Sequence, residues 1–271
     1  PGTFEGFVHD GDIVRGPGVL DMKGGLTVCI TALRMLSGAG LLSALPLRLV
    51  IVSDEEVGSP EGGAVLDRHL RGASCALTFE AGRAHDAIIT SRKGTGGIRA
   101  VARGIATHAG NHHADGANAI WALAKLIDAA QTFTDYAAGV TVSVGTITGG
   151  TTRNTVPDSA SALFDLRFLT QAAGEQLVAR FRAAAVAAAS AVPGTSIDLE
   201  GGVARPPLER TDANVALYEE YAAAAKAAGL GHGEAALVGG GSDASTTAAI
   251  GIPSIDGLGP RGSGFHTHDE L

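Results

Sequence analysis

The order in which helical and extended segments follow one another constrains the fold of this chain more than any other feature. In the first part, extended apolar runs alternate with helices, which is typical of an α/β domain built on a mostly parallel sheet. The first run is β-branched and apolar, so it predicts a strand buried on both faces. The extended runs are residues 46–53, 75–79 and 86–91, and the helices are residues 23–36 and 62–70.

The middle of the chain has a different order, β-α-β-β-α-β, which is the split-βαβ or ferredoxin-like arrangement. We therefore expect a ferredoxin-like α+β domain over residues 94–204, inserted into an α/β domain formed by residues 1–93 and 205–271. The strands are predicted at 97–104, 140–147, 159–168 and 195–199, and the helices at 118–133 and 170–192, the second capped by Thr170.

Charge and hydropathy argue against two kinds of partner. The 271 residues carry a net charge of −8 and no basic run, which argues against nucleic-acid binding. No stretch approaches the roughly 18 unbroken apolar residues of a transmembrane helix, so no membrane partner is expected. The 2 cysteines cannot form a disulfide framework. The compartment, cytoplasm or periplasm, therefore stays open.

Carboxylates gather where the predicted strands end. Glu55 and Glu56 follow the first extended run, Glu80 follows the second, Asp21 precedes a helix, and His266 lies in a glycine-rich loop. Ligands of open α/β sheets bind beyond the carboxyl ends of the strands. Singly, each of these residues is more often a solvated loop residue. Together they form the ligand types of a catalytic zinc site, with one carboxylate free to act as a base.

A series of short motifs runs in order along nearly the whole chain: GPGVLDMKGG (16–25), SDEEVGS (53–59), THAG (107–110), NTVP (154–157), DLR (165–167), GSD (241–243) and HT (266–267). The series resembles the aminoacylase and carboxypeptidase G family of di-zinc metallopeptidases, which includes acetylornithine deacetylase and succinyl-diaminopimelate desuccinylase. The first motif is most similar to the carboxypeptidase G branch. The resemblance implies a zinc-binding catalytic domain with an inserted lid that mediates dimerisation, and hence a homodimer.

The resemblance also implies a role for each residue at a matching position. Glu55 corresponds to the general base. A cis peptide bond is implied between Asp21 and Met22. The implied metal ligands are Asp21, which bridges two zinc ions, Glu56 and His266, which share one ion, and Glu80, which holds the other.

In the lid, His108 corresponds to a histidine that reaches the active site of the partner subunit. Asn154 and Arg167 correspond to residues that hold the carboxylate of the substrate. Gly240 and Gly241 correspond to a loop that contacts the same group.

One zinc ligand of the family has no counterpart. It is a His in a His-x-Asp motif that precedes a stretch like residues 1–4, PGTF. Family members also continue past the position of His266 with a closing helix. We therefore expect a fragment truncated at both ends, with two zinc ions per subunit in the full-length protein and one incomplete site here. The alternative is a natural protein that lacks one ligand.

These residue types predict hydrolysis of an amide bond next to a carboxylate-bearing group. Glu55 would take a proton from water activated by zinc, and zinc and His108 would stabilise the oxyanion. A glutamate carboxypeptidase-like metallopeptidase is the favoured function. An N-acyl amino acid deacylase or aminoacylase is the alternative, followed by a non-enzymatic peptide-binding protein. The exact substrate, and the choice among zinc, cobalt and manganese, stay open.

Overall fold

The chain forms two compact units. The computed structural model describes residues 6–271, so the stretch 1–4 discussed above lies outside the described residues. Unit 1 comprises the chain up to Arg92 together with residues 208–238 and 242–271, and unit 2 comprises residues 93–207 and 239–241. Within the described part of the chain, no helix is both long and apolar enough to cross a membrane.

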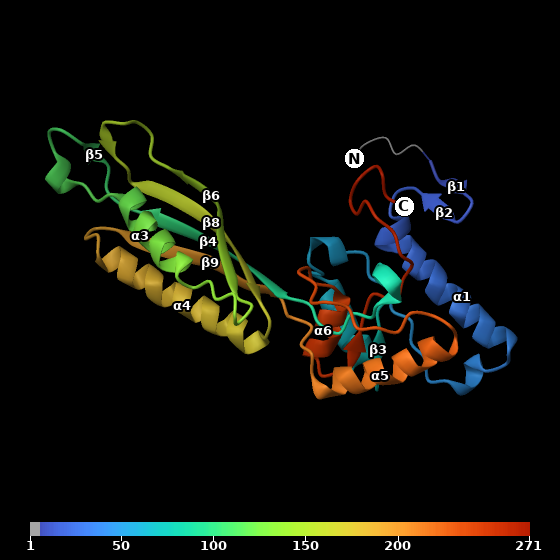
Figure 1. Cartoon of the computed structure of the whole chain (residues 1–271). Helices are drawn as coiled ribbons and strands as arrows, with labels where there is room; N and C mark the ends of the chain where they lie inside the picture. Colours follow the sequence, from blue (N-terminus) through green and yellow to red (C-terminus); the bar gives the residue numbers. More distant parts are fainter. Residues whose placement is uncertain (1–5) are drawn as a thin grey trace. The chain divides into compact units, whose positions relative to one another are not determined.

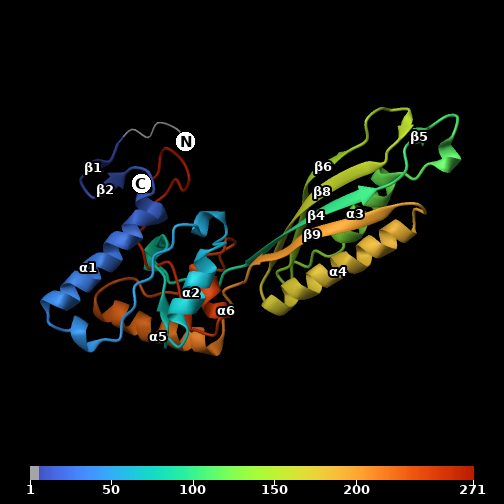
Figure 2. The same ribbon diagram turned by 180° about the vertical axis from the view of Figure 1, so that it is seen from behind.

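The described part of unit 1 consists of four α-helices and very short strands (Figures 1 and 2). Two of the helices begin at capping side chains: the Thr211 hydroxyl accepts the amide of Asn214, and the Ser242 hydroxyl accepts the amide of Ala244. The helices are α1 (Gly24–Gly38), α2 (Gly62–Leu70), α5 (Asp212–Ala227) and α6 (Asp243–Ala249). The strands are β1 (Val8–Asp10), β2 (Ile13–Arg15), β3 (Ala76–Leu77) and β10 (Ser254–Ile255).

The described residues of unit 1 do not confirm a mostly parallel sheet. Among the strands, β3 and β10 pair in the parallel sense at two positions, and β1 pairs with β2 in the antiparallel sense. Other parallel pairings are single bridges: Gly82 with Arg261, Ile88 with Glu234, and Arg92 with Val238. Residues 46–53 form no strand, and Leu47, Leu49 and Ile51 are about half exposed rather than buried. The physical reason is that a strand is defined by its ladder of hydrogen bonds. No described segment pairs with this run.

Residues 86–91 likewise form single bridges in place of a strand. Ile88 bridges Glu234, and Ile89 bridges Asp256. Ile89 nevertheless lies at the centre of a small core with Leu208 and Ala244. The apolar run therefore fills the core of unit 1 without becoming part of a continuous sheet.

Unit 2 is a four-stranded antiparallel sheet in the order β6-β8-β4-β9, covered on one face by two helices (Figure 1). A small pair of strands, β5 (Thr107–His108) and β7 (Thr155–Val156), extends from the end of the sheet at which β8 begins. The sheet strands are β4 (Gly94–Arg103), β6 (Thr141–Gly149), β8 (Ser159–Phe168) and β9 (Ser196–Arg205), and the helices are α3 (Ala119–Gln131) and α4 (Gln171–Ser190).

Alternation along the strands builds the core of unit 2. Every second residue of β8 is buried, and Phe164 packs against Phe181 of α4 with ring centroids 5.0 Å apart. Thr170 caps α4 as predicted, because its hydroxyl accepts the amide of Ala173. Gly94 permits a close approach: a Cβ there would lie 2.2 Å from the ring of Phe168.

Trp121 does not pack into this core, although large aromatic residues are usually mostly buried. Its side chain is 54% exposed and lies 5.3 Å from the ammonium group of Lys125. The reason is the helical period of α3. The buried stripe consists of Ala119, Ala122, Leu123, Leu126 and Ala130, and Trp121 lies outside it.

Candidate metal centre

Three side chains from distant parts of the chain converge in unit 1. One ligand atom each of Asp21, Glu56 and His266 lies within 4.8 Å of the others. His266 Nε2 is 3.1 Å from Asp21 Oδ2 and 3.4 Å from Glu56 Oε2. The ligand atoms of a tetrahedral zinc ion lie about 3.3 Å apart when each bond is ~2.0–2.1 Å long. The spacing and the donor set of two carboxylates and an imidazole therefore fit zinc.

Each of the three residues lies in an irregular segment. Asp21 belongs to the turn Val19–Lys23 that leads into α1, and the peptide bond from Asp21 to Met22 is cis, as the resemblance implied. Glu56 lies in the single turn Glu55–Val57 that follows the unpaired run. His266 adopts a left-handed conformation with φ 59°, in a loop closed by the bond from the Thr267 amide to the Gly264 carbonyl.

Excess negative charge characterises this region. Burial, followed by the charges of Asp256, Glu55 and Asp21, raises the pKa of Glu80 to about 8. Burial and Asp21 also raise the pKa of Glu56, whereas hydrogen bonding to Asp21 raises the pKa of His266. A divalent cation would offset this repulsion, so the electrostatics of the site agree with its donor set.

Glu80 and Glu55 lie near the three-residue cluster but are not part of it. Both carboxylates interact electrostatically with Glu56 or Asp21, and both are half-buried. The expected convergence of four ligands is therefore observed for three of them, with Glu80 set apart.

Two buried acidic residues that support this region were missed by the sequence analysis. Asp256 accepts hydrogen bonds from Arg92 Nε at 2.7 Å, from the Ser242 hydroxyl and from the amide of Gly257. Glu270 accepts three backbone amides from the turn that holds Asp21. Neither residue has a local sequence signal, because every partner except the Gly257 amide lies elsewhere along the chain.

In unit 2, His108 has a defined tautomer. Its Nδ1 accepts the amides of Gly110 and Asn111 at 3.2 and 3.1 Å. The neutral ring therefore carries its proton on Nε2, which leaves an outward N–H donor on an exposed side chain. Asn154 lies beside His108. Its backbone carbonyl accepts the amide of Ala109, and the residue after it, Thr155, pairs with His108 in the β5–β7 ladder.

Arg167 forms a second cluster with the glycine loop. Its Nε and Nη2 donate to the two oxygens of Asp165, and its Nη1 donates to the carbonyl of Gly239 at 3.4 Å. Gly241 passes so close to Arg205 that a Cβ would lie 2.3 Å from the arginine Cδ. The structure therefore brings Arg167 together with the loop that contains Gly240 and Gly241.

The two clusters of unit 2 lie at opposite ends of its sheet. The pair β5–β7 adjoins the start of β8, at Ser159, whereas Arg167 lies at the other end of the strand. Eight residues of strand span about 27 Å. Asn154 and Arg167 of one chain are therefore too far apart to contact a common carboxylate.

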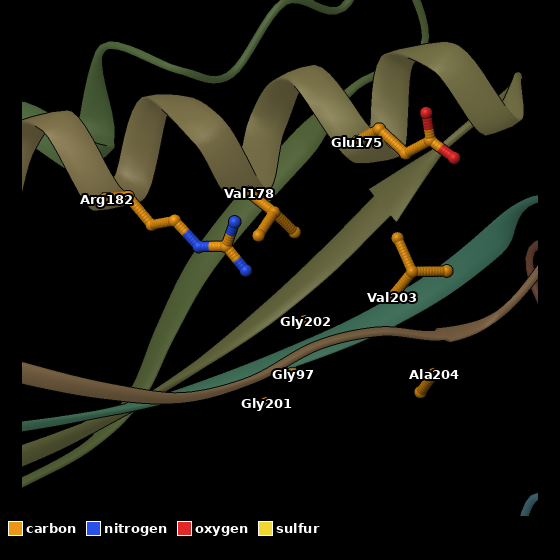
Figure 3. A pocket seen from close by; sticks show the side chains of 8 residues that line it. All are labelled: Gly97, Glu175, Val178, Arg182, Gly201, Gly202, Val203 and Ala204. Atoms are coloured by element: carbon orange, nitrogen blue, oxygen red, sulfur yellow. The ribbon is translucent and has the colours of Figure 1, made fainter.

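An open cavity of about 630 Å³ lies elsewhere in unit 2, between α4 and the strands β4 and β9 (Figure 3). Gly97, Gly201 and Gly202 line its floor, and Val178 and Arg182 extend over it from α4. It contains none of the residues that the motifs single out. The cavity results from strand positions without side chains, and it is separate from the clusters described above.

Comparisons with known proteins agree with the two-unit architecture. Residues 90–192 match the M20 peptidase dimerisation domain. The chain is 28% identical over 265 residues to carboxypeptidase G2 from Pseudomonas sp. (strain RS-16), covering 96% of this chain and 63% of that protein. It therefore spans less than two thirds of the length of this relative.

Solved structures show the same relationship. Aminopeptidase PepT from Bacillus cereus ATCC 10987 superimposes with a TM-score of 0.78 at 26% identity, over 98% of this chain and 70% of that one. A tripeptidase from Staphylococcus aureus subsp. aureus Mu50 has the same fold, with a TM-score of 0.78 at 22% identity over the same shares of the two chains. These matches confirm the resemblance to the M20 metallopeptidases.

The three-residue cluster predicts one zinc ion bound by Asp21, Glu56 and His266. Loss of a residue that only hydrogen-bonds to a metal ligand typically weakens metal binding by about 10–100-fold. Replacing His266 by Ala should weaken zinc binding by more than this, because it removes the nitrogen ligand itself. Competition with a chromophoric chelator measures the affinity. The control is His268→Ala, at an exposed histidine of the same loop. Equal zinc affinities for the two variants would contradict the assignment.

The stability of the metal-free protein should fall as the pH rises from about 5 to 8. The folded chain keeps a proton on Glu80 up to about pH 8, whereas the unfolded chain releases it near the ordinary value of 4.5. Between pH 4.5 and about 8, the folded chain therefore binds one proton more than the unfolded chain, so raising the pH favours unfolding. Urea unfolding in EDTA should show Glu80→Gln more stable than the wild type at pH 8, by about 1–3 kcal/mol.

The control for this experiment is Glu61→Gln, at an exposed carboxylate of unit 1, which should keep the wild-type slope. A Glu80→Gln protein with the wild-type pH dependence would show that Glu80 ionises normally in the folded chain.

Proposed function

We propose that the protein is a zinc-dependent hydrolase that cleaves an amide bond next to a carboxylate-bearing residue, as a glutamate carboxypeptidase does. The observation that carries the proposal is the convergence of Asp21, Glu56 and His266 at the spacing of zinc ligands. The similarity to carboxypeptidase G2 and to aminopeptidase PepT supports the same reaction class.

Asp21, Glu56 and His266 would hold one zinc ion. Asp21 would also bridge to a second ion held by Glu80, which gives two ions per subunit in the full-length protein. Zinc supplies the Lewis acidity that brings the pKa of water to about 7 and polarises a carbonyl.

Glu55 is the proposed general base. It precedes the ligand Glu56 in the same turn, is half-buried, and lies close enough to Glu80 to raise its pKa. A carboxylate that is not itself a ligand can accept the proton of the attacking water and then deliver it to the leaving amine. Two adjacent glutamates thus divide ligation and proton transfer between them.

His108 is the proposed donor to the oxyanion. Two backbone amides occupy its Nδ1, so its Nε2–H is the group available to donate. A donor aimed at a developing oxyanion contributes mainly in the transition state. On this proposal, His108 acts on the substrate bound by the partner subunit.

The proposed assembly is a homodimer formed through unit 2, which acts as a ferredoxin-like lid. The match to a dimerisation domain supports this assembly, as does the element order β4-α3-β6-β8-α4-β9. The outer edge of β6 has no pairing partner among the described strands. Exposed apolar side chains lie on this strand and on the neighbouring α3: Ile147, Ile120 and Trp121. Such an edge suits pairing with a second copy.

The substrate carboxylate would be held by Arg167 and the loop at Gly240 and Gly241 from one subunit, and by Asn154 from the other. Asp165 engages Nε and one N–H of Nη2, and Gly239 engages one N–H of Nη1, so the contact would fall to the second N–H of Nη1 or of Nη2. An N-acyl amino acid deacylase would use the same carboxylate contacts, so it remains the alternative.

Replacing Glu55 by Gln should lower kcat by about 10²–10⁴-fold, because the proton acceptor is lost, while zinc affinity stays unchanged. The assay uses zinc-loaded protein and a panel of peptides with C-terminal glutamate, peptides with other C-terminal residues, and N-acetyl amino acids. The control is Glu61→Gln, at an exposed carboxylate nearby. Hydrolysis of N-acetyl amino acids alone would favour the deacylase. No turnover of any compound by zinc-loaded wild type would refute the proposal.

Mixing His108→Ala with Glu55→Ala should restore activity that neither variant has alone. Random exchange of subunits makes half of the dimers hybrid, and each hybrid has one site with both groups intact, so about a quarter of wild-type activity is expected. Subunit exchange is followed by fluorescence transfer between labelled chains. Complete exchange without recovery would show that His108 does not act across the dimer.

A further inference from the structure

Glu270 is a buried carboxylate close to the candidate metal centre. Its side chain is 4% exposed. Its Oε1 accepts the amides of Leu20 and Asp21 at 2.9 and 2.8 Å, and its Oε2 accepts the amide of Gly18 at 2.9 Å.

This arrangement explains how the carboxylate group of Glu270 can be buried. A buried charge is costly unless hydrogen bonds satisfy it, and bonds from backbone N–H groups to a carboxylate are roughly twice as strong as bonds between neutral groups. Both oxygens are engaged by amides. Glu270 therefore contacts the backbone of the turn and is not itself placed as a ligand.

The three amides belong to the turn that carries Asp21. One of them is the amide of Asp21 itself, so Glu270 fixes the backbone from which the bridging carboxylate projects. The amide of Gly16 also donates to the carbonyl of Glu270, at 3.3 Å. The residue thus holds both ends of the segment 16–21.

Glu270 also belongs to the loop that carries His266. Ser263 and Leu271 exchange two backbone hydrogen bonds, each 3.1 Å long, which close this loop. At Gly262 a Cβ would lie 1.9 Å from the Leu271 carbonyl oxygen, so only glycine permits the closure. A single side chain therefore ties the loop of the nitrogen ligand to the turn of the bridging carboxylate.

We propose that Glu270 is the positioning residue that sets Asp21 and His266 at the spacing of one metal ion. The inference rests on the proposed metal centre and adds a residue that acts through the ligands without touching the ion. Its action is on the backbone: the amides of residues 18, 20 and 21 point at one carboxylate, and the Asp21 side chain is thereby directed at His266.

Glu270→Gln is the informative variant because it keeps the shape of the side chain. The glutamine oxygen can still accept from Leu20 and Asp21, but its NH₂ group then faces the N–H of Gly18, donor against donor. Glu270→Asp keeps the charge on a side chain one methylene shorter. Asp269→Asn is the matched control, at the adjacent exposed carboxylate. Asn214→Ala is the stability control, since it removes a buried side chain that bonds to Glu209 and Ser254 in the same unit.

The experiment measures zinc affinity by chelator competition, the visible spectrum of the cobalt-substituted protein, and the urea midpoint of the metal-free protein. Glu270→Gln should weaken zinc binding by about 10–100-fold and change the cobalt bands, whereas Asp269→Asn should do neither. Asn214→Ala should lower the urea midpoint with zinc affinity and cobalt bands unchanged. If Glu270→Gln does not fold, Glu270→Asp is measured in its place, with the same expectation.

Two outcomes would overturn the inference and are distinguishable. If the wild type binds zinc and Asp21→Asn does not, but Glu270→Gln keeps the wild-type affinity and spectrum while losing stability, Glu270 has a structural role only. If Asp21→Asn binds zinc as tightly as the wild type, or neither protein binds it, the proposed metal centre fails and the inference fails with it.

Discussion

The repulsion among neighbouring carboxylates is the constraint on which unit 1 depends. Asp21, Glu56 and Glu80 come from three separate segments, yet each affects the ionisation of another. At 4 Å, two such charges repel by about 4 kcal/mol near a protein surface. Two features limit this cost. The pKa of Glu80 is raised to about 8, so this group keeps a proton at neutral pH, and the imidazole of His266 lies against the carboxylates of Asp21 and Glu56. Because no two of these segments are adjacent in the chain, the site exists only when the whole unit is folded.

Two further carboxylates of unit 1 are buried at a lower cost, because hydrogen-bond donors satisfy them. Asp256 and Glu270 are fully or almost fully buried, and both are surrounded by donors: a guanidinium and a hydroxyl for one, backbone amides for both. A buried charge that is satisfied in this way makes its surroundings rigid. The candidate site thus contains carboxylates that repel one another, and the turn that carries one of them, Asp21, is held by a carboxylate that hydrogen bonds satisfy.

The elements that the sequence predicts well are those with local causes. The two helices of unit 2 lie where the apolar period and Thr170 place them, and the combination of ligand types indicated Asp21, Glu56 and His266. The prediction of a strand at residues 46–53 was wrong because a strand needs a neighbouring strand to pair with, and the local sequence does not specify one. Trp121 is exposed because it lies outside the apolar stripe of its helix. Glu270 could not be found, since its three contacts span about 250 residues of chain.

The separation of the two clusters along β8 has a consequence for how this protein responds to its own abundance. On the proposed arrangement, a complete substrate site contains groups from two chains, and a monomer presents only half of one. Catalytic output would then rise with the square of protein concentration when the chain is dilute, and in proportion to it once pairing is saturated. The sheet of unit 2 would in this way make the enzyme quiescent at low expression, with no ligand or modification needed.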